Sequence, residues 1–136
     1  MRSKPTYVIE GREFTTLEGF YNEISRVLIP EAEWGRNLDA FNDILRGGFG
    51  TPAGGFILEW RSSELSKERL GYSETVRQLE ERLSRCHSTA RKRVSAELEL
   101  ARKHAGPTVF DWLVEIIRLH GEGGSEAEDS VELHLK

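Results

Sequence analysis

The run Phe56-Ile57-Leu58 is the feature that most constrains how this chain can fold. Its three apolar residues do not alternate with polar ones, and Gly54-Gly55 stands just before them. This pattern predicts a short strand that is buried on both faces, and such strands belong to parallel sheets. Two other segments predict strands: Tyr7-Val8-Ile9, which ends at Gly11, and 131–135, where alternating apolar and polar residues leave one wetter face.

Helix patterns lie between the predicted strands. Thr15-Thr16-Leu17-Glu18 offers an N-cap and opens an apolar stripe that Pro30 ends. A second helix is expected from about Asn37 to Arg46. A third helix, which Gly106-Pro107-Thr108 precedes and caps, is apolar enough to lie deep in the core. The chain is therefore expected to form a small α/β layer fold.

The block from 73 to 106 is strongly helical. Apolar residues recur in it at helical spacing in two stripes, and His87-Ser88-Thr89 lies between the stripes as a break and a new N-cap. We therefore expect two helices that pack against each other or on the rest of the domain. The stripes consist of Val76, Leu79, Leu83 and Cys86, and of Ala90, Val94, Leu98 and Ala101.

The length of 136 residues is most simply that of one domain over 1–136, long enough to bury a core without disulfides or metals. The single cysteine, Cys86, cannot form an internal disulfide. The segment 1–5 leads into no apolar run of signal-peptide length, so a cytoplasmic protein is expected. No apolar stretch approaches the length of about 20 residues that crosses a bilayer, so no membrane span is expected.

The net charge of −4 argues against a general nucleic-acid binder. Acids outnumber bases between Glu10 and Glu64, whereas the block from Ser73 to His104 contains more bases than acids. Because acids are interleaved along this basic block, we interpret it as a solvated helix face rather than a nucleic-acid patch.

The sequence contains patterns that resemble enzyme motifs, but their residues lack the required order or spacing. The segment 48–53 has the spacing of a dinucleotide loop, but it follows a helix and precedes a strand, the reverse of the required order. The four histidines show no paired ligand spacing, and Cys86 lies on an apolar stripe, where a small buried thiol is expected. The sequence therefore predicts no catalytic residue, metal site or cofactor. The remaining enzyme alternative binds a small molecule or nucleotide near the glycines at 47–55.

The second expected helix has two unlike faces. Leu38, Phe41 and Leu45 follow the spacing of a buried face, whereas Asp39 and Asp43 lie four apart and point the same way. Like charges at this spacing weaken an isolated helix, so the pair indicates a binding surface that uses the negative field. A solvated helix face is the alternative interpretation.

Two motifs occur in the order and at the distance found in a known family. They are Trp34-Gly35 with Asn37-Leu38-Asp39-Ala40, and Leu58-Glu59-Trp60-Arg61. Together they resemble the barstar family of intracellular ribonuclease inhibitors. The segments 7–14, 109–120 and 131–135 also resemble this family, so the resemblance covers roughly the whole chain except about 72–107.

The resemblance implies a sheet of three parallel strands backed by helices. It also implies an inhibitor whose acidic helix and adjoining loop mimic phosphate in the basic active-site cleft of a ribonuclease. By position, Asp43 matches the family's most important carboxylate, Asp39 the carboxylate one turn earlier, and Glu115 an acid on the last helix. The partner-binding residues that the resemblance implies are Trp34, Gly35, Asn37, Asp39, Asn42, Asp43 and Glu115.

Departures from the family pattern indicate a different nuclease. Arg36 stands where the namesake has an acid, Asn42 replaces a tryptophan, and the loop 31–34 has one aromatic residue and one extra residue. The block 73–106 would then be a helical insertion. It could extend the interface, shield a sheet edge, or form a homodimer through its stripe from Val76 to Leu98. The alternative function is an interaction module of the same fold that binds a non-nuclease partner.

Overall fold

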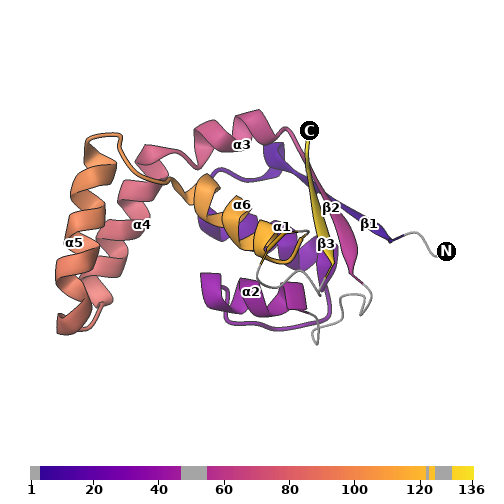
Figure 1. Cartoon of the computed structure of the whole chain (residues 1–136), viewed down its shortest axis with the longest axis horizontal. Helices are drawn as coiled ribbons and strands as arrows, with labels where there is room; N and C mark the ends of the chain where they lie inside the picture. Colours follow the sequence, from indigo (N-terminus) through magenta and orange to yellow (C-terminus); the bar gives the residue numbers. More distant parts are fainter. Residues whose placement is uncertain (1–3, 47–54, 122, 125–129) are drawn as a thin grey trace.

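The computed structural model describes residues 4–46, 55–121, 123–124 and 130–136. Within these ranges it contains a parallel sheet of three strands in the order β1-β2-β3. Helices separate the strands along the chain, which confirms the α/β fold predicted from the sequence (Figure 1). The strands are β1 (Thr6–Glu10), β2 (Phe56–Arg61) and β3 (Val131–Leu135).

The central strand β2 has two unequal faces. Phe56, Leu58 and Trp60 point to one face and are at most 1 % exposed, whereas Ile57 and Glu59 point to the other and are half-buried. The expectation that this strand is buried on both faces is therefore wrong. Figure 1 gives the reason, since the helices lie on one side of the sheet and leave the other side open.

Three helices cover the buried face of the sheet: α1 (Leu17–Leu28), α2 (Leu38–Arg46) and α6 (Val109–Leu119). The predicted N-caps are confirmed for two of them. Thr16 accepts a hydrogen bond from the Gly19 amide at the start of α1. Thr108 and Asp111 form a reciprocal capping box at the start of α6. Each cap pairs backbone amides that a helix start otherwise leaves without an acceptor.

A short helix that the sequence patterns do not predict, α3 (Ser63–Arg69), follows β2 directly. The indole Nε1 of Trp60 donates a hydrogen bond of 2.9 Å to the buried hydroxyl of Ser66. Gly11, in the 3-10 turn η1 (Gly11–Glu13), lies close to α3. A Cβ atom at this position would be 2.4 Å from the Ser66 Oγ. The chain therefore needs glycine at position 11 to let α3 approach the end of β1.

Two long helices, α4 (Tyr72–Arg85) and α5 (Ser88–Arg102), form a hairpin beside the sheet and its helices (Figure 1). The predicted break between two helices is confirmed. The N-cap predicted at His87-Ser88-Thr89 is His87, whose side chain makes no capping hydrogen bond. The hairpin has its own apolar cluster of Leu79, Val94, Leu98 and Ala101.

Most residues of this cluster belong to the stripe from Val76 to Leu98, through which the sequence allows a homodimer. Leu79, Val94 and Leu98 are at most 4 % exposed, because the two helices of the hairpin bury them against each other. A second copy of the chain could therefore not pack on these three side chains without opening the hairpin. Trp112 of α6 packs on both this cluster and the main core, so it provides an apolar contact that joins the hairpin to the rest of the fold.

Polar side chains of α4 attach the hairpin to helix α1. The carboxylate of Glu74, only 6 % exposed, accepts a hydrogen bond of 2.8 Å from the amide of Leu17 at the start of α1. Arg77 and Gln78 donate to the same carboxylate. One turn of the hairpin therefore anchors the first turn of α1, where a negative charge also interacts favourably with the helix dipole.

Replacing Glu74 with alanine should lower the free energy of unfolding by about 2 kcal/mol. The change leaves the buried Leu17 amide without its acceptor and removes one of the two carboxylates that Arg77 contacts, a loss in the range of a buried hydrogen bond to a charged group. Urea unfolding of the purified protein measures the effect. Glu80→Ala, an exposed acid on the same helix, is the matched control and should change stability by less than about 0.5 kcal/mol.

Candidate protein-binding surface

Helix α2 presents a polar face that is firmly backed by core residues. Phe41, Ile44 and Leu45 are at most 2 % exposed, whereas Asp39 and Asp43 lie on the exposed side, as their spacing predicted. The side chain of Asn37 accepts a hydrogen bond of 2.8 Å from the Ala40 amide and so caps the helix. The two carboxylates therefore stand on a helix that is fixed both by its cap and by its buried face.

The two carboxylates have different surroundings. Asp39 lies in the first turn of α2, where the helix dipole favours a negative charge. Asp43 pairs with Arg46 one turn later, with its Oδ1 3.0 Å from the Arg46 Nη1. Both side chains of this pair are about half exposed, so water screens the pair, and a partner's cation can take the place of Arg46 at little cost.

The loop before α2 is held against α1. The indole Nε1 of Trp34 donates a hydrogen bond of 2.6 Å to the Ser25 hydroxyl, and the ring meets Tyr21 edge-on at 5.3 Å. Trp34 is half-buried, so it positions the loop as well as contributing surface. Gly35 is exposed beside it, and a Cβ atom there would approach Asn37 Nδ2 to 3.1 Å.

Arg36 adopts a left-handed backbone conformation with φ of 49°. This conformation is uncommon for a residue other than glycine. The guanidinium of Arg36 donates a hydrogen bond of 2.6 Å to the side chain of Asn22 on α1. This bond holds the exposed arginine over α1, close to the start of the acidic helix.

Asn42 and Glu115 occupy contrasting positions. The Oδ1 of Asn42 lies 2.6 Å from the Nε2 of His120, a fully buried residue that ends α6. Because an amide oxygen only accepts, Nε2 carries the proton in this hydrogen bond. Asn42 thus ties α2 to α6 and is turned partly inward, whereas Glu115 is exposed on α6, the helix that packs beside α2.

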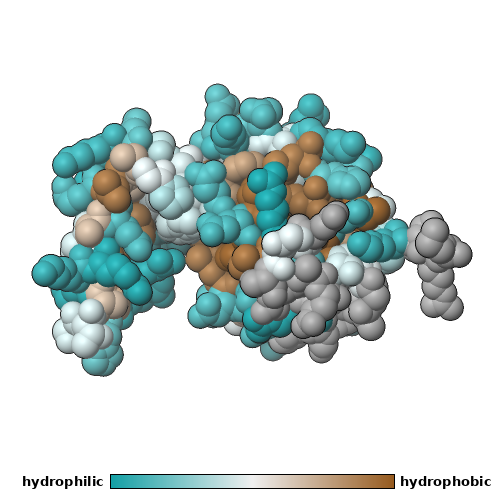
Figure 2. Space-filling view, in the orientation of Figure 1, coloured by the Kyte–Doolittle hydropathy of each residue, from teal (hydrophilic) through white to brown (hydrophobic). Residues whose placement is uncertain are grey.

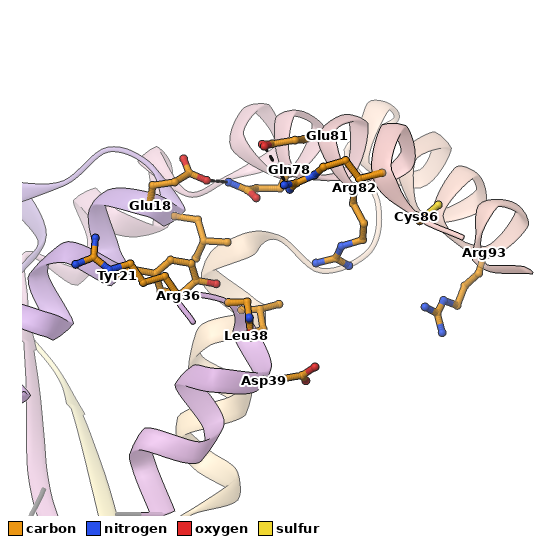
Figure 3. Close-up of a pocket in the computed structure, with 13 residues that line it drawn as sticks. Glu18, Tyr21, Arg36, Leu38, Asp39, Gln78, Glu81, Arg82, Cys86 and Arg93 are labelled. Carbon is orange, nitrogen blue, oxygen red and sulfur yellow. Dashed lines mark hydrogen bonds and ion pairs between the residues drawn. The ribbon is translucent and has the colours of Figure 1, made fainter. Parts of the chain in front are cut away.

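Sequence reasoning missed a cleft of about 850 Å³ that opens between α1, the start of α2 and the hairpin. Figure 3 shows Asp39 at one wall of this cleft and the guanidinium groups of Arg82 and Arg93 reaching in from the hairpin. The arginines of α4 recur at helical spacing in the sequence, but the sequence does not show that the hairpin turns them toward α2. The charged residues that line the cleft are Arg36, Arg82, Arg85 and Arg93, with Glu18, Asp39 and Glu81.

A hydrogen-bonded network lies at the α1 side of the cleft. Burial acts to raise the pKa of the Glu18 carboxyl, but hydrogen bonds from Gln78 and Arg77 outweigh it and the pKa is lowered. Burial, with the nearby charge of Glu18, raises the pKa of the Tyr21 hydroxyl. At neutral pH Glu18 is therefore ionised and Tyr21 is not, so the cleft has fixed charges.

Other classes of site find no support among the described residues. No group of three or more His, Cys, Asp or Glu side chains in these ranges is arranged to hold a metal ion. No helix in the same ranges is long and apolar enough to cross a membrane. Of the glycine segment 47–55, the alternative nucleotide site, residues 47–54 lie outside the described residues.

The fold is that of a small parallel α/β protein with an exposed acidic helix. A comparison with models of protein families matches residues 5–101, more than two thirds of the chain, to the family described as Barstar (barnase inhibitor). The chain therefore belongs to the barstar family, as its motifs indicated. Members of this family are inhibitors rather than enzymes. The matched range ends at the last turn of α5, one residue before the end of the hairpin, and stops short of α6. No curated protein matches the chain.

Asn42→Ala should lower the free energy of unfolding by about 1 to 2 kcal/mol, since it removes the Asn42 hydrogen bond from a buried histidine. Urea unfolding followed by circular dichroism measures the change. Glu115→Ala, on the exposed side of α6, should stay within about 0.5 kcal/mol of the wild type. Equal stability of the Asn42→Ala and wild-type proteins would show that this hydrogen bond does not hold α2 to α6.

Proposed function

We propose that this protein inhibits a ribonuclease by placing α2 and the loop before it over the active site of the enzyme. A ribonuclease binds the phosphates of RNA with cationic side chains. A rigid surface that bears carboxylates can occupy the same place, because charge-assisted hydrogen bonds form with carboxylate as they do with phosphate. The inhibitor itself then needs no catalytic group.

The observation that carries this proposal is the arrangement of Asp39 and Asp43. Both are exposed on one side of α2, one helical turn apart, while the opposite side of the helix is buried in the core. Two like charges at this spacing cost the isolated helix stability, and a cationic partner would remove that cost on binding. Opposite fields would also raise the rate of association.

The rigidity of the surface supports the proposal as well. Asn37 caps the helix, Asn42 bonds to His120, and Trp34 is fixed to Ser25, so α2 and the loop before it have anchoring contacts along their length. A surface that is already ordered loses little conformational entropy when it binds, and this saving appears as affinity. Glu115, on the neighbouring helix, would add a further carboxylate to the interface.

One observation favours the alternative, an interaction module that binds a non-nuclease partner. Arg46 pairs with Asp43, and Arg36 lies in the loop before α2, so the surface is less acidic than its carboxylates alone would make it. A partner with a mixed surface charge would suit this pattern. Such a module would form a tight protein complex and leave every ribonuclease active.

Asp43→Ala should weaken the complex with the inhibited ribonuclease by at least about 2 kcal/mol, because it leaves a desolvated cation of the enzyme unpaired. The measurement is titration of the protein against a panel of microbial guanyl-specific ribonucleases, with RNA cleavage as the readout, at low and physiological salt. The variant should also associate with a smaller salt dependence than the wild type.

Glu64→Ala is the matched control, since Glu64 is an exposed acid on α3, far from α2 (Figure 1). It should inhibit like the wild type. A loss under about 0.5 kcal/mol for Asp43→Ala would remove Asp43 from the site. Absence of inhibition across the panel, together with a stable complex with another protein, would favour the interaction module.

A further inference from the structure

The cleft between the hairpin and α2 adjoins the proposed inhibitory surface. Arg36 and Asp39 line the cleft, and Asp39 is also one of the two carboxylates of α2 that would meet the nuclease. The hairpin forms the facing wall, and Figure 3 shows Arg82 and Arg93 pointing from it into the space above Asp39. A partner seated on α2 would therefore lie against the hairpin as well.

The described carboxylates of the hairpin pair with only some of the arginines on this wall. Arg85 pairs with Glu81 at 3.3 Å, but among the described residues no carboxylate pairs with Arg82 or Arg93. The Arg82 guanidinium instead stacks on the ring of Trp112, 5.3 Å from its centroid, which orients the charge without cancelling it. Arg93 is exposed on α5. The wall thus presents two positive charges that no carboxylate of the described residues pairs with.

An apolar hollow of about 310 Å³ adjoins the charged cleft and shares Leu38 and Arg82 with it. Leu100 lines this hollow and is 49 % exposed, so its side chain is accessible to a partner. Figure 2 shows hydrophobic surface at the end of the body that faces the hairpin. The hairpin and α2 therefore offer arginines and an apolar contact next to each other.

We propose that this cleft receives an acidic segment of the same partner protein, with glutamate or aspartate at Arg82 and Arg93 and an apolar side chain beside Leu38 and Leu100. This inference rests on the proposed function, since it assigns a second contact to the inhibited nuclease. The partner would then have a cationic active site that meets Asp43 and an acidic rim that meets the hairpin. Such paired requirements select one nuclease among several.

A nucleic-acid strand fits the cleft less well than an acidic protein segment. Glu18 and Asp39 line the wall opposite the hairpin and Glu81 lies on the hairpin wall itself, so a continuous phosphate backbone would meet carboxylates on both walls. A protein segment carries separate charges and can place an apolar side chain in the adjoining hollow. The chain also has a net charge of −4, which disfavours RNA at long range.

The test uses the full-length protein and a synthetic octapeptide that alternates glutamate with leucine. NMR follows the side-chain Nε–Hε signals of Arg82 and Arg93 and the indole signal of Trp112 during titration. We expect these signals to shift with peptide at low salt. The double variant Arg82→Gln with Arg93→Gln should bind the peptide at least about fivefold more weakly, as expected for the loss of two partly exposed ion pairs.

Lys92→Gln is the matched control, because Lys92 is exposed next to Arg93 but does not line the cleft. It should bind the peptide like the wild type. The single variant Arg93→Gln keeps the stacking of Arg82 on Trp112. It replaces the double variant in the peptide titration if the double variant unfolds. Cleft signals that stay unchanged with peptide overturn the proposal. Stronger shifts with single-stranded RNA or tripolyphosphate also overturn it, since the cleft would then bind phosphate.

The peptide titration and the nuclease titration answer separate questions. If no ribonuclease in the panel is inhibited, the protein forms a stable complex with another protein, and the peptide binds at the cleft, the proposed function fails and the acidic segment belongs to that other partner. If a ribonuclease is inhibited equally by the wild type and by Arg93→Gln, and the peptide does not bind, the proposed function stands and the role of the hairpin is overturned.

Discussion

The contact between Glu74 and the first turn of α1 sets how the two parts of this molecule meet. The Glu74 carboxylate accepts a hydrogen bond from the Leu17 amide. Arg77 forms ion pairs with both Glu74 and Glu18, and Glu18 lies on the exposed side of the same turn of α1. Trp34 and Arg36, which position the loop before α2, also rest on α1. One helix therefore carries both the hairpin and the loop of the proposed interface, and their relative position depends on a buried carboxylate.

Local signals in the sequence were sufficient to predict elements whose stability is local. The caps at Thr16 and Thr108, the break near His87 and the two faces of α2 all depend on residues within one or two helical turns of each other. The same applies to the exposed carboxylates Asp39 and Asp43, since a helix with an apolar stripe must turn its other side to water.

Features that depend on distant contacts could not be predicted in this way. Helix α3 is short and polar in sequence. The hydrogen bond from Trp60 to Ser66 fixes it in place, and the lack of a side chain at Gly11 leaves room for it. The open face of β2 depends on where the helices lie, which three apolar residues in a row do not reveal. The buried Glu74 carboxylate accepts a hydrogen bond from the Leu17 amide, 57 residues away in the sequence, and nothing in the residues around Glu74 indicates this contact.

Neighbouring residues on α2 show why a family resemblance cannot assign roles position by position. Successive residues on a helix point about 100° apart, so Asn42 can face α6 while Asp43 faces solvent. Asn42 stands where the family pattern has a tryptophan, and its hydrogen bond to His120 commits part of that side chain to the fold. An interface with less aromatic area at this position needs contact area elsewhere, since buried aromatic anchors carry much of the binding energy in protein complexes. In the proposed complex, the hairpin wall beside Asp39 would provide it. Affinity in this protein would then come from two adjoining surfaces of opposite charge rather than from the acidic helix alone.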